Sequence, residues 1–210
     1  MIDIVSKFRP ARILDVGCSD GLTFEELLKK TRSTEAYAVD INEDLVKEAR
    51  SKGIMAYVVD VDVDSLPFGN DFFDCVVASE VIEHLLDPDH LLDEVFRVLI
   101  KGGLFALSTP NLAAWYNRIA LLGGIQPFHT EVSLRYNVGK VFSDINLISG
   151  HIRAFTPRAL LELSRLHGFT VRILGVSDFD SLPFPVNVID RIFSKRATLA
   201  SHTIAILTKT

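Results

Sequence analysis

The sequence predicts an α/β fold, in which short buried strands alternate with amphipathic helices and form a mainly parallel sheet. Short apolar runs recur along the first half of the chain, and a helical pattern follows most of them. The first run contains Ile13, Leu14 and Val16, and is typical of a strand buried on both faces of a parallel sheet. A loop bracketed by Gly17 and Gly21 follows this run and leads directly into a helix.

The glycine loop indicates a ligand site. A strand, a tight loop and a helix N-terminus together present backbone N–H groups to a ligand. Gly17 and Gly21 are separated by three residues, so the loop lacks the G-x-G-x-x-G spacing of dinucleotide sites. Asp15 and Asp20 add two carboxylates, which would repel a pyrophosphate. The loop therefore favours a cationic or zwitterionic ligand; the alternative is an ordinary strand-to-helix crossover.

Residues 15–21 read D-V-G-C-S-D-G. This segment resembles motif I of the class I S-adenosylmethionine (SAM) methyltransferases, typically D-x-G-C-G-x-G, with Ser19 in place of a glycine. The resemblance implies that SAM is the cofactor. It assigns Asp15, Gly17 and Gly21 to the cofactor site, beside the cationic methionine end of SAM.

The composition restricts the class of protein that this chain can belong to. A chain of 210 residues is most economically one domain, residues 1–210. Hydrophobic residues make up 48% of it, yet no apolar run approaches the about 20 residues that span a bilayer. Charged residues near the N-terminus also argue against a signal peptide. We therefore expect a cytoplasmic protein without a transmembrane segment.

Charge and cysteine content add two exclusions. The net charge of −5 argues against a nucleic-acid surface built on bulk charge. Cys18 and Cys75 have neither the spacing of metal ligands nor the number needed for a disulfide framework. The composition leaves a homodimer open.

Asp40 ends the second predicted strand, residues 35–40, and a helix begins near Asn42. It follows the glycine loop by about 20 residues, the spacing at which an acid binds a ribose in βαβ units. A carboxylate has two acceptor oxygens for the two hydroxyls of a ribose. Asp40 therefore supports nucleoside binding, although SAM and NAD share the ribose and a solvated turn aspartate is the alternative.

Residues 54–61 are predicted as the third strand, and D-V-D-S-L-P-F follows. This segment resembles the family's D-x-x-x-L-P-F motif, in which the aspartate accepts a hydrogen bond from the adenine amino group. The resemblance assigns that role to Asp62 and places Val63 beside the adenine ring. Asp60 takes the role if the strand register is shifted, and a merely solvated acidic loop is the other alternative.

Residues 72–81 are predicted as the fourth strand, followed by a helix with Asp87 as N-cap and Pro88 in its first turn. The helix is expected to continue to residues 101–103, Lys-Gly-Gly, and residues 104–108 form the fifth strand. This run closely resembles the type 11/12 methyltransferase family, and the resemblance extends from Arg12 to about Asn111. It implies a three-layer Rossmann-like fold with a seven-stranded sheet. Strands six and seven fall at residues 170–176 and 201–207, the last antiparallel and between strands five and six.

Residues 112–150 are expected to form a lid and acceptor-binding insertion. They contain an amphipathic helix at 112–122 and then a long irregular stretch, which is usually functional in a compact domain. An excursion after strand five lies over the ligand crevice in this fold. The family's N-terminal lid helices have little room before Arg12, which moves that function to this insertion. An exposed helix packed on the core explains Trp115 and Tyr116 equally well.

A methyltransferase would transfer the methyl group by an in-line displacement. The attacking atom would be an oxygen, nitrogen or carbon of a small-molecule or lipid-like acceptor. A base would help a hydroxyl acceptor. The candidates are Glu83, His84, His129 and His151, of which His84 and His151 are the expected catalytic residues. Arg153 lies beside His151, where the insertion rejoins the fold.

Glu80-x-x-Glu83-His84 also resembles a pattern in ubiquinone-pathway O-methyltransferases and small-RNA 2′-O-methyltransferases. The resemblance implies that these residues, with a downstream histidine such as His151, can hold a divalent metal. Carboxylates and imidazoles suit Mn²⁺, Fe²⁺ or Zn²⁺. Many methyltransferases carry the same turn without a metal, so a metal is not among the expected sites.

Two other functions stay open. A SAM-binding regulator would keep Gly17, Gly21 and Asp40 without turnover. A nicotinamide-dependent oxidoreductase would need a loop that tolerates phosphate, which Asp15 and Asp20 oppose.

Overall fold

Seven strands form the sheet in the computed structural model, which describes residues 1–133, 135–140, 148–177 and 184–210. Their order is β3-β2-β1-β4-β5-β7-β6. The first five strands pair in parallel, whereas β7 is antiparallel to both β5 and β6. The strand bounds are β1 Arg12–Val16, β2 Glu35–Asp40, β3 Met55–Val58, β4 Phe73–Ser79, β5 Leu99–Pro110, β6 Phe169–Val176 and β7 His202–Lys209. The expected sheet, with its last strand inserted between strands five and six, is confirmed.

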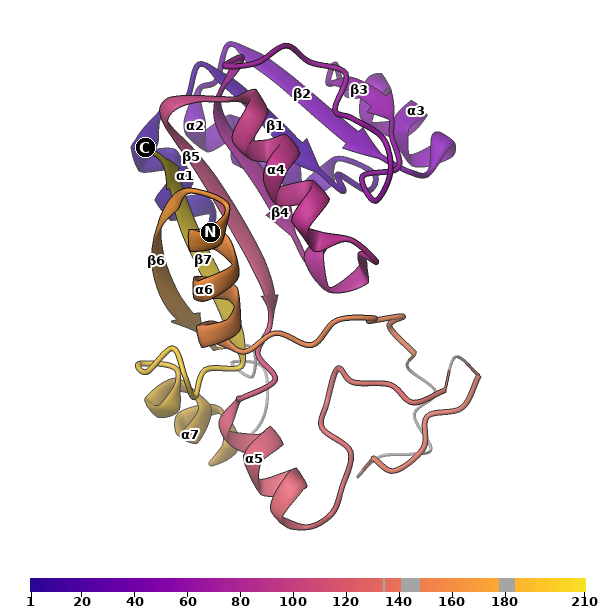
Figure 1. Ribbon diagram of the computed structural model, residues 1–210, viewed down its shortest axis with the longest axis vertical. Helices are drawn as coiled ribbons and strands as arrows, with labels where there is room; N and C mark the ends of the chain where they lie inside the picture. The colour runs from indigo at the N-terminus through magenta and orange to yellow at the C-terminus, as the bar shows by residue number, and fades with distance from the viewer. Residues whose placement is uncertain (134, 141–147, 178–183) are drawn as a thin grey trace.

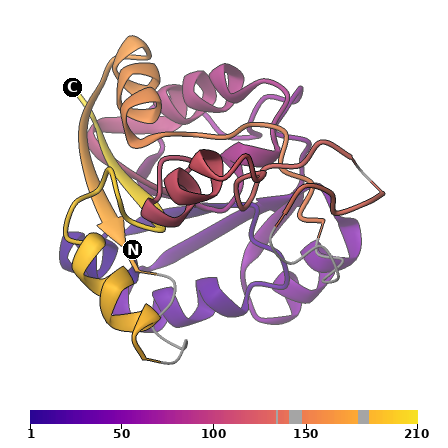
Figure 2. The ribbon, with the colours of Figure 1, turned by 90° about the horizontal axis from the view of Figure 1, so that it is seen from below.

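Helices cover both faces of the sheet and complete the three layers (Figures 1 and 2). Buried residues of α1, α2 and α3 pack on one face, and those of α4 and α6 pack on the other. The helix bounds are α1 Ile2–Phe8, α2 Leu22–Thr31, α3 Glu43–Ser51, α4 Pro88–Val98, α5 Trp115–Leu122, α6 Pro157–Leu166 and α7 Val186–Phe193, with the 3₁₀ turn η1 at Ile82–His84.

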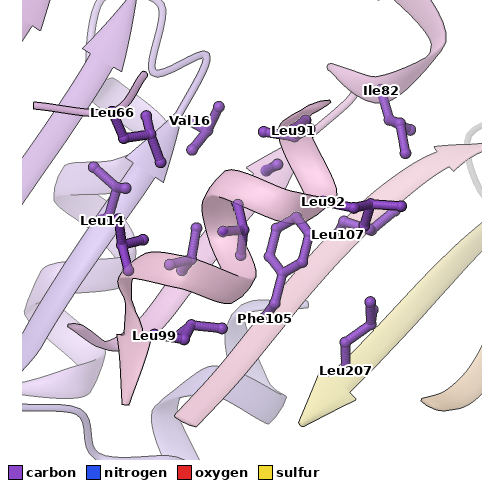
Figure 3. Packing of buried hydrophobic residues seen from close by; sticks show 14 of the residues in the cluster. Leu14, Val16, Leu66, Ile82, Leu91, Leu92, Leu99, Phe105, Leu107 and Leu207 are labelled. Atoms are coloured by element: carbon purple, nitrogen blue, oxygen red, sulfur yellow. The ribbon is translucent and has the colours of Figure 1, made fainter. Parts of the chain in front are cut away.

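The two-sided burial of β1 explains its apolar run. Leu14 and Val16 belong to the core cluster under α4, and Ile13 belongs to the cluster under α2 and α3. Side chains alternate between the two faces of a strand, so a strand covered on both faces needs apolar residues at both. Leu14 and Val16 lie in the same cluster as Leu91 of α4, and all three are labelled in Figure 3. Full burial of each such side chain contributes about 1.5–3 kcal/mol.

The expected helix starts are confirmed. Asp87 is the N-cap of α4 and accepts a hydrogen bond from the His90 N–H, with Pro88 in the first turn. Asn42 caps α3 in the same way. A short polar side chain satisfies the N–H groups that a first helical turn leaves free, which is why these starts are visible in sequence.

The end of α4 differs from the prediction. The helix ends at Val98, so residues 101–103 lie inside β5 rather than after the helix. Leu99 already pairs with Phe73 of β4, and the register shifts before Cys75. These residues therefore lie in the strand that pairs with β4 and do not continue the helix. The third strand is also shorter than the predicted 54–61, because the backbone turns at Asp60, whose carbonyl accepts hydrogen bonds from residues 63 and 64.

Two helices lie where the sequence assigned none. Helix α1 precedes β1 and buries Val5. Helix α7 lies beside α5, beyond the carboxyl end of β5 (Figure 1). Its Asp190 is buried and accepts hydrogen bonds from the Trp115 indole and the Ser201 hydroxyl. This polar contact holds α7 to α5 and to the start of β7.

The expected insertion at 112–150 is described only in part, since residues 134 and 141–147 fall outside the described residues. Its first helix is α5, Trp115–Leu122, beyond the carboxyl end of β5 (Figure 1). A role as a lid stays a prediction. In the part of the chain that is described, no helix is long and apolar enough to cross a membrane.

Candidate active site

A hollow of about 310 Å³ lies at the carboxyl ends of β1, β2 and β4. In an open parallel sheet this is the edge at which ligands bind. Several residues expected in the cofactor site line it, together with one acid and one histidine from the acceptor side. The principal lining residues are Gly17, Asp40, Asp60, Asp62, Glu80 and His84.

Asp40 holds the glycine loop as well as facing this hollow. Its Oδ2 accepts a hydrogen bond from the Ser19 N–H at 2.9 Å, and its Oδ1 accepts one from the Asn42 N–H at 2.9 Å. Each carboxylate oxygen has a further lone pair, so both remain able to accept from ribose hydroxyls. The geometry fits the nucleoside role expected for Asp40.

The loop glycines are required by their backbone and by space. Gly17 has φ of 72°, and a Cβ there would lie 2.5 Å from Cγ2 of Val81. Gly21, the N-cap of α2, has φ of 78°. Ser19, at the position where the family has a glycine, also has a positive φ of 51°. The backbone here follows the left-handed path that glycine adopts without strain, and at Gly17 the Val81 side chain occupies the space that a Cβ would need.

Asp15 lies beneath the loop and does not line the hollow. Its side chain is buried, and burial together with the negative charge of Asp40 raises its pKa to about 8. Asp15 is therefore largely protonated at pH 7. Asp20, the second acid of the loop, accepts a hydrogen bond from the Leu22 N–H at the start of α2.

The structure brings both adenine candidates to the hollow. Asp60 and Asp62 line it, and Asp62 Oδ1 also accepts a hydrogen bond from the Asp87 N–H at 2.9 Å. Val63 is 71% exposed and is not among the lining residues. The choice between Asp60 and Asp62 therefore stays open, and Val63 stays a prediction that the geometry does not support.

Three residues expected on the acceptor side come together next to this hollow. One ligand atom from each of Glu83, His84 and His151 lies within 4.8 Å of the others. The N–H groups of Ile152 and Arg153 donate to the backbone carbonyl of Glu83, at 2.8 and 2.9 Å. These two bonds bring the far end of the insertion back to η1 and place His151 opposite Glu83.

Backbone carbonyls fix the tautomers of both histidines. Nδ1 of His84 lies 3.2 Å from the carbonyl oxygen of Gly150, and Nδ1 of His151 lies 3.1 Å from that of His129. A carbonyl oxygen only accepts, so Nδ1 must carry the proton in each ring. When the ring is neutral, Nε2 therefore keeps the lone pair. Nε2 of His151 lies 4.0 Å from Oε1 of Glu83.

Glu83 is 1% exposed and only partly satisfied. Its Oε2 accepts from the Thr109 hydroxyl at 3.0 Å, whereas Oε1 is buried and has no hydrogen-bond partner in the described structure. Burial and the nearby charge of Glu80 raise the pKa of Glu83. Burial, with a contribution from His84, lowers the pKa of His151 and so favours its neutral form. A buried carboxyl oxygen without a partner is costly, so Oε1 is placed to meet a proton, a hydroxyl or a cation.

Glu80 is not among the three residues whose ligand atoms converge, although its carboxyl lies close enough to Glu83 to interact with it. Its Oε1 accepts from the Ser108 hydroxyl at 2.8 Å, and its Oε2 lies 3.3 Å from Nε2 of His202. The His129 ring lies between those of His151 and His202, with centroids 5.7 and 5.8 Å away. Sequence reasoning missed His202 because no motif joins it to Glu80.

Comparison with known proteins finds similarity to methyltransferases. Residues 14–107 match the family model described as a methyltransferase domain. A ubiquinone biosynthesis O-methyltransferase of Xylella fastidiosa is 32% identical over 130 residues, which is 58% of this chain and 52% of that protein. A probable S-adenosylmethionine-dependent methyltransferase of Mycolicibacterium smegmatis is 27% identical over 164 residues, 76% of this chain and 61% of that protein.

The fold has close matches among solved structures. The S-adenosylmethionine-dependent methyltransferase from Mesorhizobium loti has a TM-score of 0.67 at 18% identity, covering 99% of this chain and 96% of that one. The chain spans 52% and 61% of the lengths of the two curated relatives.

Proposed function

We propose that this chain is a class I SAM-dependent methyltransferase and transfers the methyl group of SAM to an oxygen of a hydroxylated small molecule, a proposal that the similarity of residues 14–107 to a methyltransferase domain supports. SAM supplies a methyl group bound to a sulfonium, which departs readily when a nucleophile attacks in line. The chain has to hold the two reactants in that line, which is worth about 7–11 kcal/mol in favourable cases.

The cofactor edge supports this proposal through the groups it presents to a nucleoside. Asp40 offers two acceptor oxygens to a ribose, and either Asp60 or Asp62 offers one to an adenine amino group. Gly17 also lines this hollow, with the Val81 side chain packed against it.

The single observation that carries the choice of an oxygen acceptor is the orientation of His151. Its Nδ1 donates to the His129 carbonyl and its pKa is lowered, so a lone pair on Nε2 faces the space beside Glu83. That nitrogen can take the proton of an acceptor hydroxyl as the oxygen gains the methyl group. Such a base contributes about 10²–10⁴-fold to the rate. The names of the curated O-methyltransferase relatives point the same way.

A divalent cation fits the same three residues. One ligand atom from each of Glu83, His84 and His151 converges, and Nδ1 of each histidine contacts a backbone carbonyl. Metal-bound histidines commonly make that second contact. Two imidazoles and a carboxylate suit Mn²⁺, Fe²⁺ or Zn²⁺, and a bound ion would lower the pKa of an acceptor hydroxyl.

The segment after β5 supplies the other wall of the acceptor side in this proposal. A hollow of only about 10 Å³, room for about one water molecule, lies beside His151 and is lined by Glu83 and Thr109 and by Leu112, Phe128 and His129 of the insertion. A hydroxylated acceptor would enter between the insertion and η1. This supports a lid and acceptor-binding role for residues 112–150.

The test is methyl transfer from radiolabelled SAM into cell extract fractionated into lipid, small-molecule, protein and RNA pools. We expect label in the small-molecule or lipid pool, in a product that carries a methyl ether. Calorimetry should show binding of SAM and of S-adenosylhomocysteine. Binding without transfer to any pool would favour a SAM-binding regulator, and binding of NADH instead would overturn the proposal.

The metal is tested separately, by metal analysis of the wild type, His84→Ala and His90→Ala after dialysis. His90 Nε2 contacts the Asp64 carbonyl and is not part of the Glu83 group, so it is the matched control. Retained Mn, Fe or Zn in the wild type and in His90→Ala, but not in His84→Ala, would support the ion. Activity that a chelator does not change would leave His151 as the base.

A further inference from the structure

A second hollow, of about 490 Å³, lies at the amino ends of β1 and β2. It is formed by the residues that end α1 and α2 and by those that begin the two strands. Because β1 and β2 are parallel, this edge is opposite to the edge that carries Asp40 and Gly17. We call it the basic hollow and define it by Ser6, Arg9, Lys30, Thr31, Arg32 and Thr34.

The charge of the basic hollow is one-sided. Three of its lining residues are cationic and no acidic residue lines it, in a chain of net charge −5. Within the described residues, neither Arg9 nor Arg32 has a side-chain hydrogen bond or an ion pair. Lys30 is the most neutralised of the three, with Glu26 at 3.4 Å and Asp3 at 3.9 Å.

The nearby carboxylate of Asp74 is already engaged. Its Oδ2 accepts hydrogen bonds from the backbone N–H groups of Ala11 and Arg12, at 2.9 and 2.6 Å. The Asp74 carboxylate therefore binds the backbone at the start of β1, and the two guanidinium groups are left without a counter-charge. An anion from solution would supply one.

The backbone at Arg9 and Arg32 is strained for a residue with a side chain. They are the C-caps of α1 and α2, with φ of 52° and 61°. Glycine is the relaxed residue in that conformation, and another residue costs about 1–2 kcal/mol. Both positions carry arginine despite this cost, and both side chains line the same hollow.

Helix dipoles do not account for the arrangement. Cations near helix C-termini are favourable, which explains Lys7, Lys29 and Lys30 in the last turns. Each helix end carries only about half a negative charge, however, and a lysine already faces it. The positive charges of the two arginines are therefore additional to those that stabilise the helix C-termini.

We propose that the basic hollow binds a small phosphorylated molecule. Guanidinium groups pair with two phosphate oxygens at once, and two of them can hold a diphosphate between them. The volume lies within the about 300–1,000 Å³ typical of small-molecule sites. A long polyanion is disfavoured because the rest of this acidic chain would repel it.

The test is calorimetric titration of inorganic pyrophosphate into the full chain. The variant Arg9→Asn/Arg32→Asn removes both charges, and asparagine tolerates a positive φ better than most residues. Arg165→Asn is the matched control, since Arg165 is an exposed arginine in the last turn of α6. We expect the double variant to bind pyrophosphate at least about tenfold more weakly, and the control to match the wild type within about twofold.

A second variant, Arg9→Lys/Arg32→Lys, keeps the charges but loses the paired donors, and should fall between the wild type and the asparagine variant. Titration with S-adenosylhomocysteine should give the same affinity in all four proteins, so this result is independent of the methyltransferase proposal. No pyrophosphate binding by the wild type would overturn the inference. So would equal weakening in Arg165→Asn, displacement of pyrophosphate by S-adenosylhomocysteine, or binding only to a single-stranded oligonucleotide or to anionic vesicles.

Discussion

The imidazole rings of His84 and His151 lie with their centroids 4.8 Å apart, and each ring donates Nδ1–H to a backbone carbonyl. The two residues come from opposite ends of the acceptor side, η1 and the end of the insertion. Nε2 of each ring is therefore left without this bond, and Nε2 of His151 lies 4.0 Å from Oε1 of Glu83.

His151→Gln should slow methyl transfer by about 10²–10⁴-fold, because the proton acceptor is lost. The affinity for S-adenosylhomocysteine should stay within about twofold, since His151 does not line the cofactor hollow. Initial rates and calorimetry on the same preparations measure both quantities. His90→Gln is the control and should keep its activity. A His151→Gln enzyme with the wild-type rate would assign His151 to loop structure alone.

Asp40→Ala should bind S-adenosylhomocysteine about ten- to a hundredfold more weakly, as hydrogen bonds to a charged group contribute about 1.5–3 kcal/mol. Part of this loss comes through the loop, because Asp40 also accepts from the Ser19 N–H. Calorimetry gives the dissociation constant. Asp44→Ala, an exposed acid in the first turn of α3, should leave it unchanged. An unchanged constant in a folded Asp40→Ala would place the ribose elsewhere.

Gly17→Ala should destabilise the fold more than Gly102→Ala. Both glycines have a similar positive φ, 72° and 77°, so alanine pays the same conformational cost of about 1–2 kcal/mol at each. Only at Gly17 does the new Cβ meet a neighbour, Cγ2 of Val81 at 2.5 Å. Urea denaturation measures the difference. Equal losses would show that Val81 moves aside freely.

The free energy of unfolding should fall as the pH rises from about 4 to about 8 because of Asp15. Burial first, and then the charge of Asp40, raise its pKa from 3.8 to about 8 in the folded state. The folded state therefore holds this proton more tightly than the unfolded state, and that advantage shrinks as the pH rises. Asp15→Asn stays neutral and should not show this part of the decline. Urea midpoints of both proteins between pH 5 and pH 9 would reveal it, and parallel curves would contradict the raised pKa.

The bonds of His167 should also make the stability of the fold fall as the pH rises, in this case above about pH 6.5. Burial alone would lower its pKa, but hydrogen bonds to Asp89 at 2.9 Å and Asp93 at 2.7 Å raise it above 6.5. This link between α6 and α4 is complete below pH 6.5 and weakens as the pH rises through the folded-state pKa. The effect is modest because both aspartates are exposed.

The variant His167→Gln should remove that part of the pH dependence of the urea midpoint. His90→Gln serves as the control, since His90 contacts a carbonyl oxygen rather than a carboxylate. The link would be contradicted if the difference in urea midpoint between the wild type and His167→Gln did not change between pH 6 and pH 9.

The sequence alone determined the features that depend on neighbours along the chain. The burial of Ile13 and Leu14, the path of the loop at Gly17 and the position of Asp40 at the end of β2 all follow from periodicity, backbone preference and spacing within one βαβ unit. The cap at Asp87 belongs to the same class, because it bonds to a residue three positions away. Such features are local, so the residues that decide them are adjacent in the sequence.

Only the tertiary structure decided the features that depend on chain segments meeting across the sheet. The end of α4 was set by the pairing of Leu99 with Phe73. Glu80 faces His202 of β7, although it is close to Glu83 in the sequence. The protonated nitrogen of His151 was set by the carbonyl of His129. These outcomes depend on distances and directions between segments far apart in sequence, and neither residue type nor spacing encodes them.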